Sequence, residues 1–307
     1  MDEHTNDAIA VTGLRMRYGT NDVLHGVDFR VRRGEVVALL GPNGAGKTTI
    51  IEILEGFRFR SAGDVNVLGR DPEHAEEAWR AEVGIVLQSW RDHAKWRVGE
   101  LLAHLGEFYV PFATADRRRP WPAGELVEVV GLADLAGQRV ARLSGGQRRR
   151  LDVAIGLVGR PELLFLDEPT AGFDPEARRG FHDLVHRLSD LEETTILLTT
   201  HDLDEADKLA DRILILARGR IVADGSGDEL ARRVSTHAEV RWTVNGERHV
   251  HETEDATEFV RQLLLEGEGP VADLEVRRAS LEDTYMKLVR RDESVSVASD
   301  PNEEAAA

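Results

Sequence analysis

The chain has 307 residues and a formal net charge of −17. Its apolar content of 41% and charged content of 31% are typical of a soluble globular protein, and its length allows one large domain with an appendage. The negative balance argues against general nucleic-acid binding, which requires a basic surface.

Cysteine and long apolar runs are both missing from the sequence. Disulfides and thiolate metal sites are therefore excluded, and no run approaches the roughly 18–20 apolar residues of a membrane span. The polar, acidic residues 1–4 do not resemble a signal peptide. We expect a cytoplasmic protein, with any role at a membrane requiring a separate partner chain. Two arginine triplets, 117–119 and 148–150, are interpreted as solvated helix faces.

Residues 9–37 alternate between apolar runs and turns marked by glycine, a pattern typical of strands. An antiparallel sheet that leads into the next segment is the simplest interpretation. Tyr18 falls in the turn 17–19, an exposed position for an aromatic side chain. On its own it would be interpreted as a partly buried surface ring. The expected strands are 9–11, 23–24 and 27–31.

The central motif of the chain follows the apolar run 36–40, which predicts a buried strand. Its glycines let backbone N–H groups curl around an anion, and the helix that follows adds the positive end of its dipole. Lys47 supplies a cation for the β- and γ-phosphates, and the Thr48 hydroxyl is placed to bind Mg²⁺. The pattern G-x-x-x-x-G-K-[ST] between strand and helix predicts a phosphate-binding loop. Its residues are Gly41, Pro42, Asn43, Gly44, Ala45, Gly46, Lys47 and Thr48, followed by Thr49.

A helical insertion is predicted over about residues 89–160. Before it, the turn residues of 56–69 indicate a hairpin, and 83–87 is a short apolar strand that ends at Gln88. Within the insertion, helical spacing recurs after 91 with Pro and Gly breakers between the helices. The expected helices are 99–109 and 124–130.

A second anion-binding element opens the next helix, which runs to about residue 158. Ser144 is a suitable N-cap, and the helix N-terminus leaves N–H groups facing outward. Because this element lies on the insertion, it is too far from Lys47 to serve the same nucleotide. Two chains facing head to tail would solve this, each covering the other's ATP. The element is Leu143, Ser144, Gly145, Gly146 and Gln147.

Polar side chains follow three apolar strands of the predicted parallel sheet, whose carboxyl ends share the edge of the phosphate loop. Asp167 can hold Mg²⁺ there, directly or through water, and Glu168 can polarise the attacking water as general base. Gln88 and His201 can reach the γ-phosphate, the water or the metal. Each residue alone would be interpreted as structural, and the shared edge favours the functional interpretation. The strands before Asp167 and His201 are 163–166 and 195–200.

Strands that alternate with helices imply a largely parallel sheet up to about residue 225, with helices at 176–188 and 202–209 and a hairpin turning at 218–219. The pattern then changes, because Asn245-Gly246 predicts a two-residue hairpin. We expect a small α+β domain over 226–291 and a disordered tail over 292–307. The further elements expected in the α+β domain are a helix at 256–266, a strand at 271–276 and a helix at 281–290.

With these motifs in this order, residues 7–225 resemble the ATP-binding subunit of ABC transporters. The resemblance implies an α/β P-loop NTPase core with an antiparallel β subdomain and a helical subdomain. It also implies that Tyr18 stacks on adenine and that His201 grips the γ-phosphate. Gln88 would sense the γ-phosphate and Mg²⁺ beside the groove that receives the membrane permease. Residues 144–147 would contact the ATP bound to the opposite subunit.

The segment Ala171-Gly172-Phe173-Asp174 departs from the Ser-Gly-Leu-Asp that the family commonly carries. In this family the aspartate, here Asp174, links the two nucleotide sites of a dimer. Because it is kept and no other catalytic position is lost, two active sites per homodimer are expected, while their coupling can differ.

Residues 279–288, Ala-Ser-Leu-Glu-Asp-Thr-Tyr-Met-Lys-Leu, resemble the tail of drug-resistance exporter ATPases of the daunorubicin type. This resemblance implies an ATPase that drives drug efflux through a separate permease at the cytoplasmic face of the membrane. Subunits that export sodium, polysaccharide or lipid share these features. An importer ATPase and an ABC ATPase without a transport role are further alternatives. No nucleic-acid partner is expected.

Overall fold

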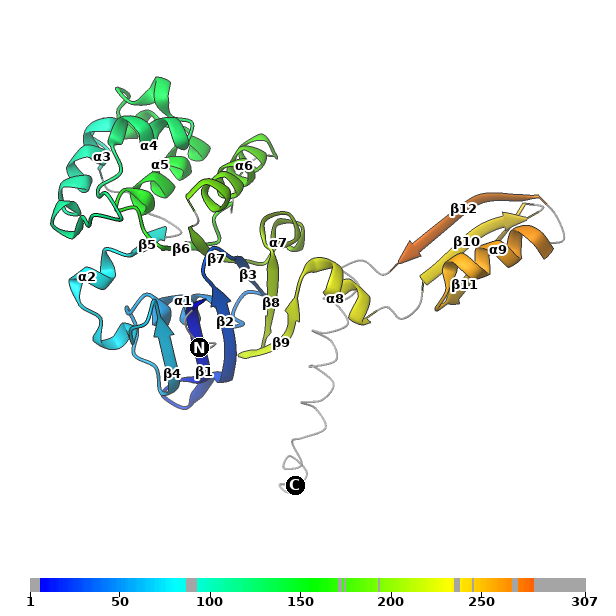
Figure 1. Cartoon of the computed structure of the whole chain (residues 1–307). Helices are drawn as coiled ribbons and strands as arrows, with labels where there is room; N and C mark the ends of the chain where they lie inside the picture. Colours follow the sequence, from blue (N-terminus) through cyan, green and yellow to red (C-terminus); the bar gives the residue numbers. More distant parts are fainter. Residues whose placement is uncertain are drawn as a thin grey trace, which may run out of the picture. The chain divides into compact units, whose positions relative to one another are not determined.

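The computed structural model describes residues 6–86, 93–170, 173, 175–192, 194–234, 238–244, 246–266 and 270–278 (Figure 1). The predictions for Gln88 and Asp174, for the helix at 281–290 and for the terminal tail lie outside these residues. The chain divides into two compact units, residues 1–221 and 222–307. No helix among the described ranges is both long and apolar enough to cross a membrane.

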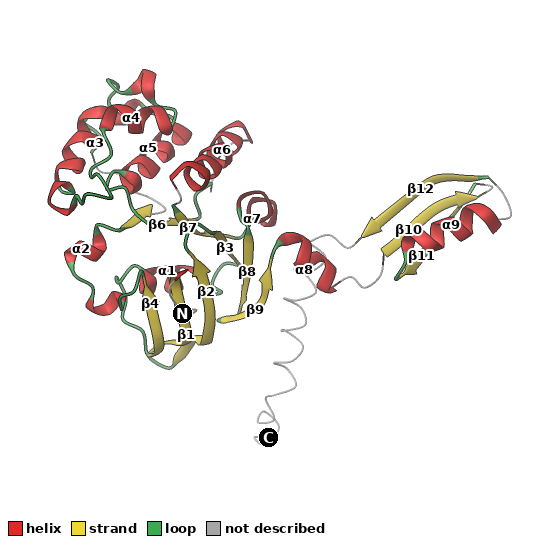
Figure 2. Ribbon diagram, in the orientation of Figure 1, coloured by secondary structure: helices red, strands yellow, loops and turns green. Residues whose placement is uncertain are grey.

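The N-terminal part of the chain forms a three-stranded antiparallel sheet in the order β2-β1-β4 (Figure 2). Strands β1 and β2 come before the phosphate loop in sequence, and β4 comes after it. The prediction of such a sheet is confirmed, but two details are wrong. Gly13 and Gly26, interpreted as turns, have positive φ inside continuous strands, where register shifts absorb the extra residues as bulges. The segment 56–69 contains a single strand, β4, which pairs with β1 and does not form a hairpin of its own. The strands are β1 (Asp7–Tyr18), β2 (Asn21–Arg32) and β4 (Ala62–Val67).

The central sheet has six strands in the order β5-β6-β7-β3-β8-β9, and the pairs β5·β6, β6·β7, β7·β3 and β3·β8 are parallel. Every residue of β3 and β7 is buried, which explains their continuous apolar character. Leu40 pairs with Thr200, and Asp167 pairs with Thr199. The carboxyl ends of three strands therefore meet at one edge. The strands are β3 (Val36–Leu40), β5 (Val83–Val86), β6 (Leu163–Asp167), β7 (Thr195–Thr200), β8 (Arg212–Ala217) and β9 (Arg220–Gly225).

Three helices, α3, α4 and α5, pack on one another and form the predicted helical insertion, and α5 also packs on β5 (Figure 2). The α-helices of this unit are α1 (Lys47–Leu54), α2 (Glu77–Arg80), α3 (Val98–Glu107), α4 (Ala123–Val129), α5 (Gly145–Leu157), α6 (Pro175–Glu192) and α7 (Leu203–Leu209). Short 3₁₀ helices are η2 (Pro72–His74), η3 (Val110–Phe112), η4 (Ala133–Leu135) and η5 (Val140–Arg142).

The interpretation of both arginine triplets as solvated helix faces is wrong. Arg119 and Arg149 are only 8% and 7% exposed. Residues 117–119 are not helical, and the Arg117 guanidinium donates to the Arg160 carbonyl oxygen at 3.0 Å. Arginine can be buried in this way because its long stem packs on apolar atoms while its fork bonds carbonyl oxygens.

The second unit contains a three-stranded antiparallel sheet in the order β11-β10-β12, with α9 packed on β10. Val244 pairs with Glu247, which confirms the two-residue hairpin. Helix α8 was not predicted, although the sequence carries its signal. Ser226 and Glu229 each accept a hydrogen bond from the other's backbone N–H, as a capping box requires. The elements are α8 (Gly227–Val234), β10 (Ala238–Val244), β11 (Glu247–Thr253), α9 (Ala256–Glu266) and β12 (Val271–Arg278).

Candidate nucleotide-binding site

The loop between β3 and α1 has a backbone that its glycines make possible. Gly46, the N-cap of α1, has φ 108°, and a Cβ added there would lie 2.8 Å from Leu24 Cδ2. At Gly41 an added Cβ would lie 2.4 Å from the Leu216 carbonyl oxygen. The N-cap Gly46 has no side chain that could cap α1. Among the described residues, the first N–H groups of α1 therefore have no competing side-chain acceptor, as an anion site requires.

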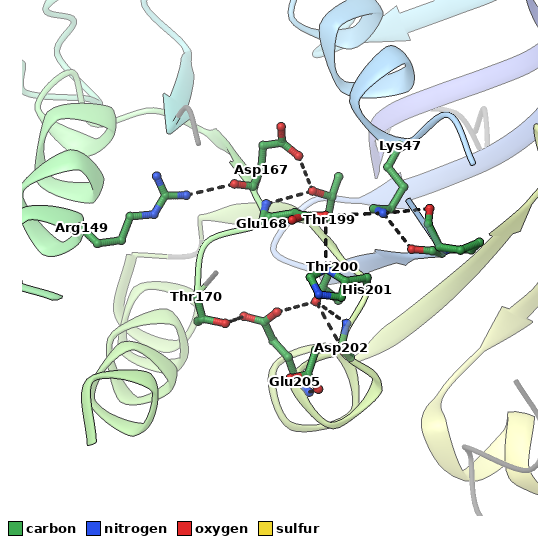
Figure 3. Close-up of polar contacts among 12 residues, drawn as sticks. Lys47, Arg149, Asp167, Glu168, Thr170, Thr199, Thr200, His201, Asp202 and Glu205 are labelled. Atoms are coloured by element: carbon green, nitrogen blue, oxygen red, sulfur yellow. Dashed lines mark hydrogen bonds and ion pairs between the residues drawn. The ribbon is translucent and has the colours of Figure 1, made fainter. Parts of the chain in front are cut away.

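The Lys47 side chain lies along this loop and is only 5% exposed. Its ammonium group donates to the carbonyl oxygens of Gly41 and Pro42, at 2.8 and 3.2 Å. It also lies 3.6 Å from Glu168 Oε1 (Figure 3). Burial lowers the pKa of Lys47, and the negative charge of Glu168 opposes that shift. The cation is thus held beside the loop by groups that keep it charged.

Thr199, which the sequence analysis did not single out, organises the end of β6. Its hydroxyl donates to Asp167 Oδ1 at 2.5 Å and accepts the Glu168 backbone N–H at 3.0 Å (Figure 3). Glu168 has φ 43°, an uncommon value for a residue with a side chain. The pairing of Thr199 with Asp167 in neighbouring strands explains how one hydroxyl serves both residues.

His201 completes a cluster around the Glu168 carboxylate. Its Nδ1 lies 3.3 Å from Glu168 Oε1, the oxygen that also faces Lys47. Lys47 is the first residue of α1, the helix after β3, whereas Glu168 and His201 directly follow β6 and β7. The edge predicted from the sequence therefore brings Lys47, Asp167, Glu168 and His201 together, whereas Gln88 lies outside the described residues.

The donors expected for Mg²⁺ are an Asp167 carboxylate and a Thr48 hydroxyl, both hard oxygen ligands of the kind that this ion prefers. Asp167 is half-buried at the end of β6, and Thr48 is exposed in the first turn of α1. The chemistry of this donor set fits a magnesium ion bound between protein and phosphate oxygens.

Arg149 joins α5 to the end of β6, a role that its interpretation as a surface residue missed. Its Nη2 donates to the Asp167 carbonyl oxygen at 3.0 Å (Figure 3). Its Nε donates to the Pro169 carbonyl oxygen at 2.9 Å. Burial lowers the pKa of this arginine, and the negative charges of nearby Asp152 and Asp167 oppose that shift. The backbone on both sides of Glu168 is therefore bonded to one guanidinium.

Glu205 holds the segment after β6 to the segment after β7. Its two carboxylate oxygens accept the hydroxyls of Thr170 and Thr200, each at 2.5 Å, and the residue is 3% exposed. Burial raises the pKa of this carboxyl group, and the two hydroxyl donors oppose the shift. The spacing Asp202-x-x-Glu205 suggests a helix cap, and Asp202 does accept the Glu205 N–H. Only the structure shows where the Glu205 side chain turns.

Ser144 is the N-cap of α5, as predicted. Its hydroxyl accepts the Gln147 N–H at 3.3 Å, and the Gln147 side chain accepts the Ser144 N–H at 2.9 Å. These residues lie at the start of α5 in the helical insertion and are not part of the cluster around Glu168. Tyr18, the last residue of β1, is also separate from that cluster. It is 39% exposed, and the Arg58 guanidinium lies 5.1 Å from its ring centroid.

The chain is similar to known proteins in both sequence and structure. A family model described as ABC transporter matches residues 24–171. The chain is 43% identical over 223 residues to the daunorubicin resistance ATP-binding protein DrrA3 of Streptomyces coeruleorubidus, covering 73% of this chain and 69% of that protein. It is 42% identical over 226 residues to the Nod factor export ATP-binding protein I of Ralstonia nicotianae, covering 72% and 68%.

Two solved structures show the same fold. The ADP conformation of MJ1267, an ATP-binding cassette of an ABC transporter, aligns with a TM-score of 0.64 and 26% identity, covering 73% of this chain and 93% of that chain. A bacterial Atm1-family ABC exporter with ATP bound aligns with a TM-score of 0.62 and 26% identity, covering 75% and 40%.

Proposed function

Because this chain belongs to the ATP-binding subunits of ABC transporters, an ATPase family that couples hydrolysis to transport, we propose that it powers an exporter whose membrane permease is a separate chain. ATP supplies the energy, and the protein contributes phosphate binding, water activation and a surface for the permease. The subunit works at the cytoplasmic face of the membrane.

The observation that carries the proposal is that the side chains of Lys47 and His201 both contact the Glu168 carboxylate. This contact lies at the edge of the central sheet where the phosphate loop leads into α1. Lys47 binds the β- and γ-phosphates through its ammonium group. Thr48 and Asp167 would hold Mg²⁺, which would neutralise phosphate charge. Glu168 accepts the proton of the attacking water, and His201 holds the γ-phosphate. In the same proposal Tyr18 stacks on the adenine, and Gln88 senses the γ-phosphate and the metal.

A head-to-tail homodimer is the assembly that we propose. The N-terminus of α5 lies in the helical insertion, and within one chain its Ser144 and Gln147 bond each other. In the dimer, residues 144–147 of one subunit contact the γ-phosphate held by the phosphate loop of the other, and Asp174 links the two sites. Each ATP is then enclosed by two subunits.

The proposed cargo is a drug-like or lipophilic molecule. The support is the 43% identity to a daunorubicin resistance ATP-binding protein. A second cargo class is favoured by the 42% identity to a Nod factor export ATP-binding protein. Efflux assays with daunorubicin in cells that express the chain with its permease separate the two. The first cargo predicts a lower cellular drug content, and the second predicts no change.

Glu168→Gln tests the ATPase assignment. The amide keeps the size of the side chain but cannot take a proton, so we expect turnover to fall by about 100-fold or more. ATP binding should persist, and an ATP-bound dimer should accumulate in size-exclusion chromatography. Glu125→Gln, at an exposed position of α4, is the matched control. Turnover by Glu168→Gln equal to that of the wild type would remove Glu168 from the base role.

A further inference from the structure

A cavity of about 540 Å³ is lined by residues from the end of α1, from α2, β5, α3 and α5 and from the segment after α3, all in the same unit. Its walls are mainly apolar and aromatic. Phe57 and Phe108 stand at its rim with 67% and 64% of their surface exposed. Trp79 and Tyr109 contribute further aromatic surface. Large exposed aromatic side chains around a cavity of this size are typical of a surface that binds another molecule.

The carboxyl group of Glu55 lines this apolar cavity and has no partner among the residues that the structure describes. Glu55 is 6% exposed and lines the cavity. Among the described residues, no group donates a hydrogen bond to its carboxylate and no basic group lies within ion-pair distance. Arg58, the nearest arginine in sequence, bonds Glu52 instead at 2.6 Å. Arg80 also lines the cavity but is exposed and makes no ion pair with Glu55. Buried carboxyl groups are normally paired, so an unpaired one needs an explanation.

The surroundings of Glu55 all favour a positive charge. Glu55 is the C-cap of α1, the end of a helix that carries partial negative charge. Burial raises the pKa of Glu55 to about 8, and the negative charges of Asp167 and Glu52 add to this shift. A cation placed in the cavity would meet the Glu55 carboxyl group and the C-terminus of α1. Its aliphatic stem would meet apolar walls and aromatic faces.

We propose that this cavity receives an arginine or lysine side chain, set among apolar residues, from the permease, and that Glu55 is its counter-ion. The inference rests on the proposed function, since it takes the permease as the partner. Arginine fits best, because its guanidinium bonds a carboxylate in two places and stacks on aromatic rings. The choice of permease by the ATPase then depends on one buried charge, while Phe57 and Phe108 supply contact area.

The test is a charge-reversal rescue with the complete ATPase and the permease that co-purifies with it. Glu55→Lys should abolish co-purification, and Glu55→Gln should weaken it by about 10-fold. Each basic residue in the cytoplasmic loops of the permease is then changed to glutamate. One of these changes should restore the complex with Glu55→Lys and weaken the complex with the wild-type ATPase. Glu107→Lys, at an exposed end of α3, is the matched control and should assemble normally.

The outcomes separate the two proposals. If no membrane protein co-purifies with the wild-type chain, the proposed function itself is contradicted. A wild-type complex that Glu55→Lys and Glu55→Gln leave intact overturns the inference alone, as does failure of every reversed permease residue to rescue. Glu55→Gln preserves side-chain volume, so a normal melting curve and normal ATP turnover of the isolated subunit show that it folds. A carboxyl pKa of Glu55 that falls when the permease binds, measured by ¹³C NMR, supports the ion pair, and an unchanged pKa contradicts it.

Discussion

The N-termini of α1 and α5 are both predicted to bind phosphate, yet they differ in how their N–H groups are satisfied. Helix α1 begins at a glycine with no side-chain cap, and Lys47 lies beside it. Helix α5 begins at Ser144, whose hydroxyl and backbone are bonded to Gln147 in a capping box. The first site is open to an anion within one chain. The second is satisfied internally, so its residues must exchange partners when another subunit brings a phosphate.

The largest expected effect comes from removing the cation of the open site. Lys47→Ala removes the ammonium group that charge-assisted hydrogen bonds require, so ATP affinity should fall by roughly 100-fold, or about 3 kcal/mol. Isothermal titration calorimetry measures this loss. Lys208→Ala, at an exposed position of α7, should bind ATP as the wild type does. Equal affinities for all three proteins would show that Lys47 does not bind the nucleotide.

The next effect concerns the connection between α5 and the catalytic edge. Arg149→Ala leaves the carbonyl oxygens of Asp167 and Pro169 without their buried donor, so unfolding free energy should fall by about 3 kcal/mol. Turnover should fall as well, because the backbone around Glu168 loses its support. Urea unfolding and a turnover assay check both. Arg142→Ala, at an exposed position just before α5, should change neither by much. A stable and fully active Arg149→Ala protein would contradict the positioning role.

Much of the site could be predicted from sequence because its residues have fixed places in motifs. The phosphate loop, Glu168 and His201 each follow a buried strand, and parallel strands share an edge. Arg149, Thr199 and Glu205 could not be found in this way. Their roles depend on which carbonyl or hydroxyl a neighbouring segment presents, and that is set by packing between elements distant in sequence. Arg149 illustrates the point, because a triplet of arginines indicates a solvated face until a second layer covers it.

The fold shows the same division. Short apolar runs predicted the parallel strands well, since burial on both faces leaves a clear pattern. Gly13 and Gly26 were predicted as turns because glycine serves bulges and turns alike. Helix α8 was missed although Ser226 and Glu229 form a capping box, because only Leu230, Ala231 and Val234 of its eight residues are apolar.

A smaller effect compares two capping boxes. Ser144→Ala and Ser226→Ala each remove a serine cap, so each should lower unfolding free energy by about 1 kcal/mol. Only Ser144→Ala should also lower turnover, by at least about 10-fold, because only that helix is proposed to face ATP. ATP binding to the isolated subunit should stay unchanged in both. Equal turnover in the two variants would mean that the α5 terminus has a structural role alone.

A pH-dependent effect on stability is expected at the other end of α1. The pKa of Glu55 is raised from 4.5 to about 8, so the folded state holds its proton more tightly than the unfolded state. The contribution of this carboxyl group to stability is therefore greatest below pH 4.5 and is lost as the pH rises through 8. Glu55→Gln removes this loss and should stabilise the isolated subunit by about 1–2 kcal/mol at pH 8.5, with little gain at pH 5. Thermal melts at both pH values check this, and a gain independent of pH would contradict it.

The head-to-tail arrangement is tested most directly by mixing two inactive proteins. Lys47→Ala damages the phosphate loop, and Ser144→Ala damages the opposite element. A mixed dimer in a head-to-tail arrangement has one site with both defects and one site with neither. Mixing equal amounts should therefore restore roughly a quarter of wild-type turnover, since about half of the dimers are mixed and each has one intact site. Turnover of the mixture no higher than the mean of the two separate proteins would show that each site is built within a single chain.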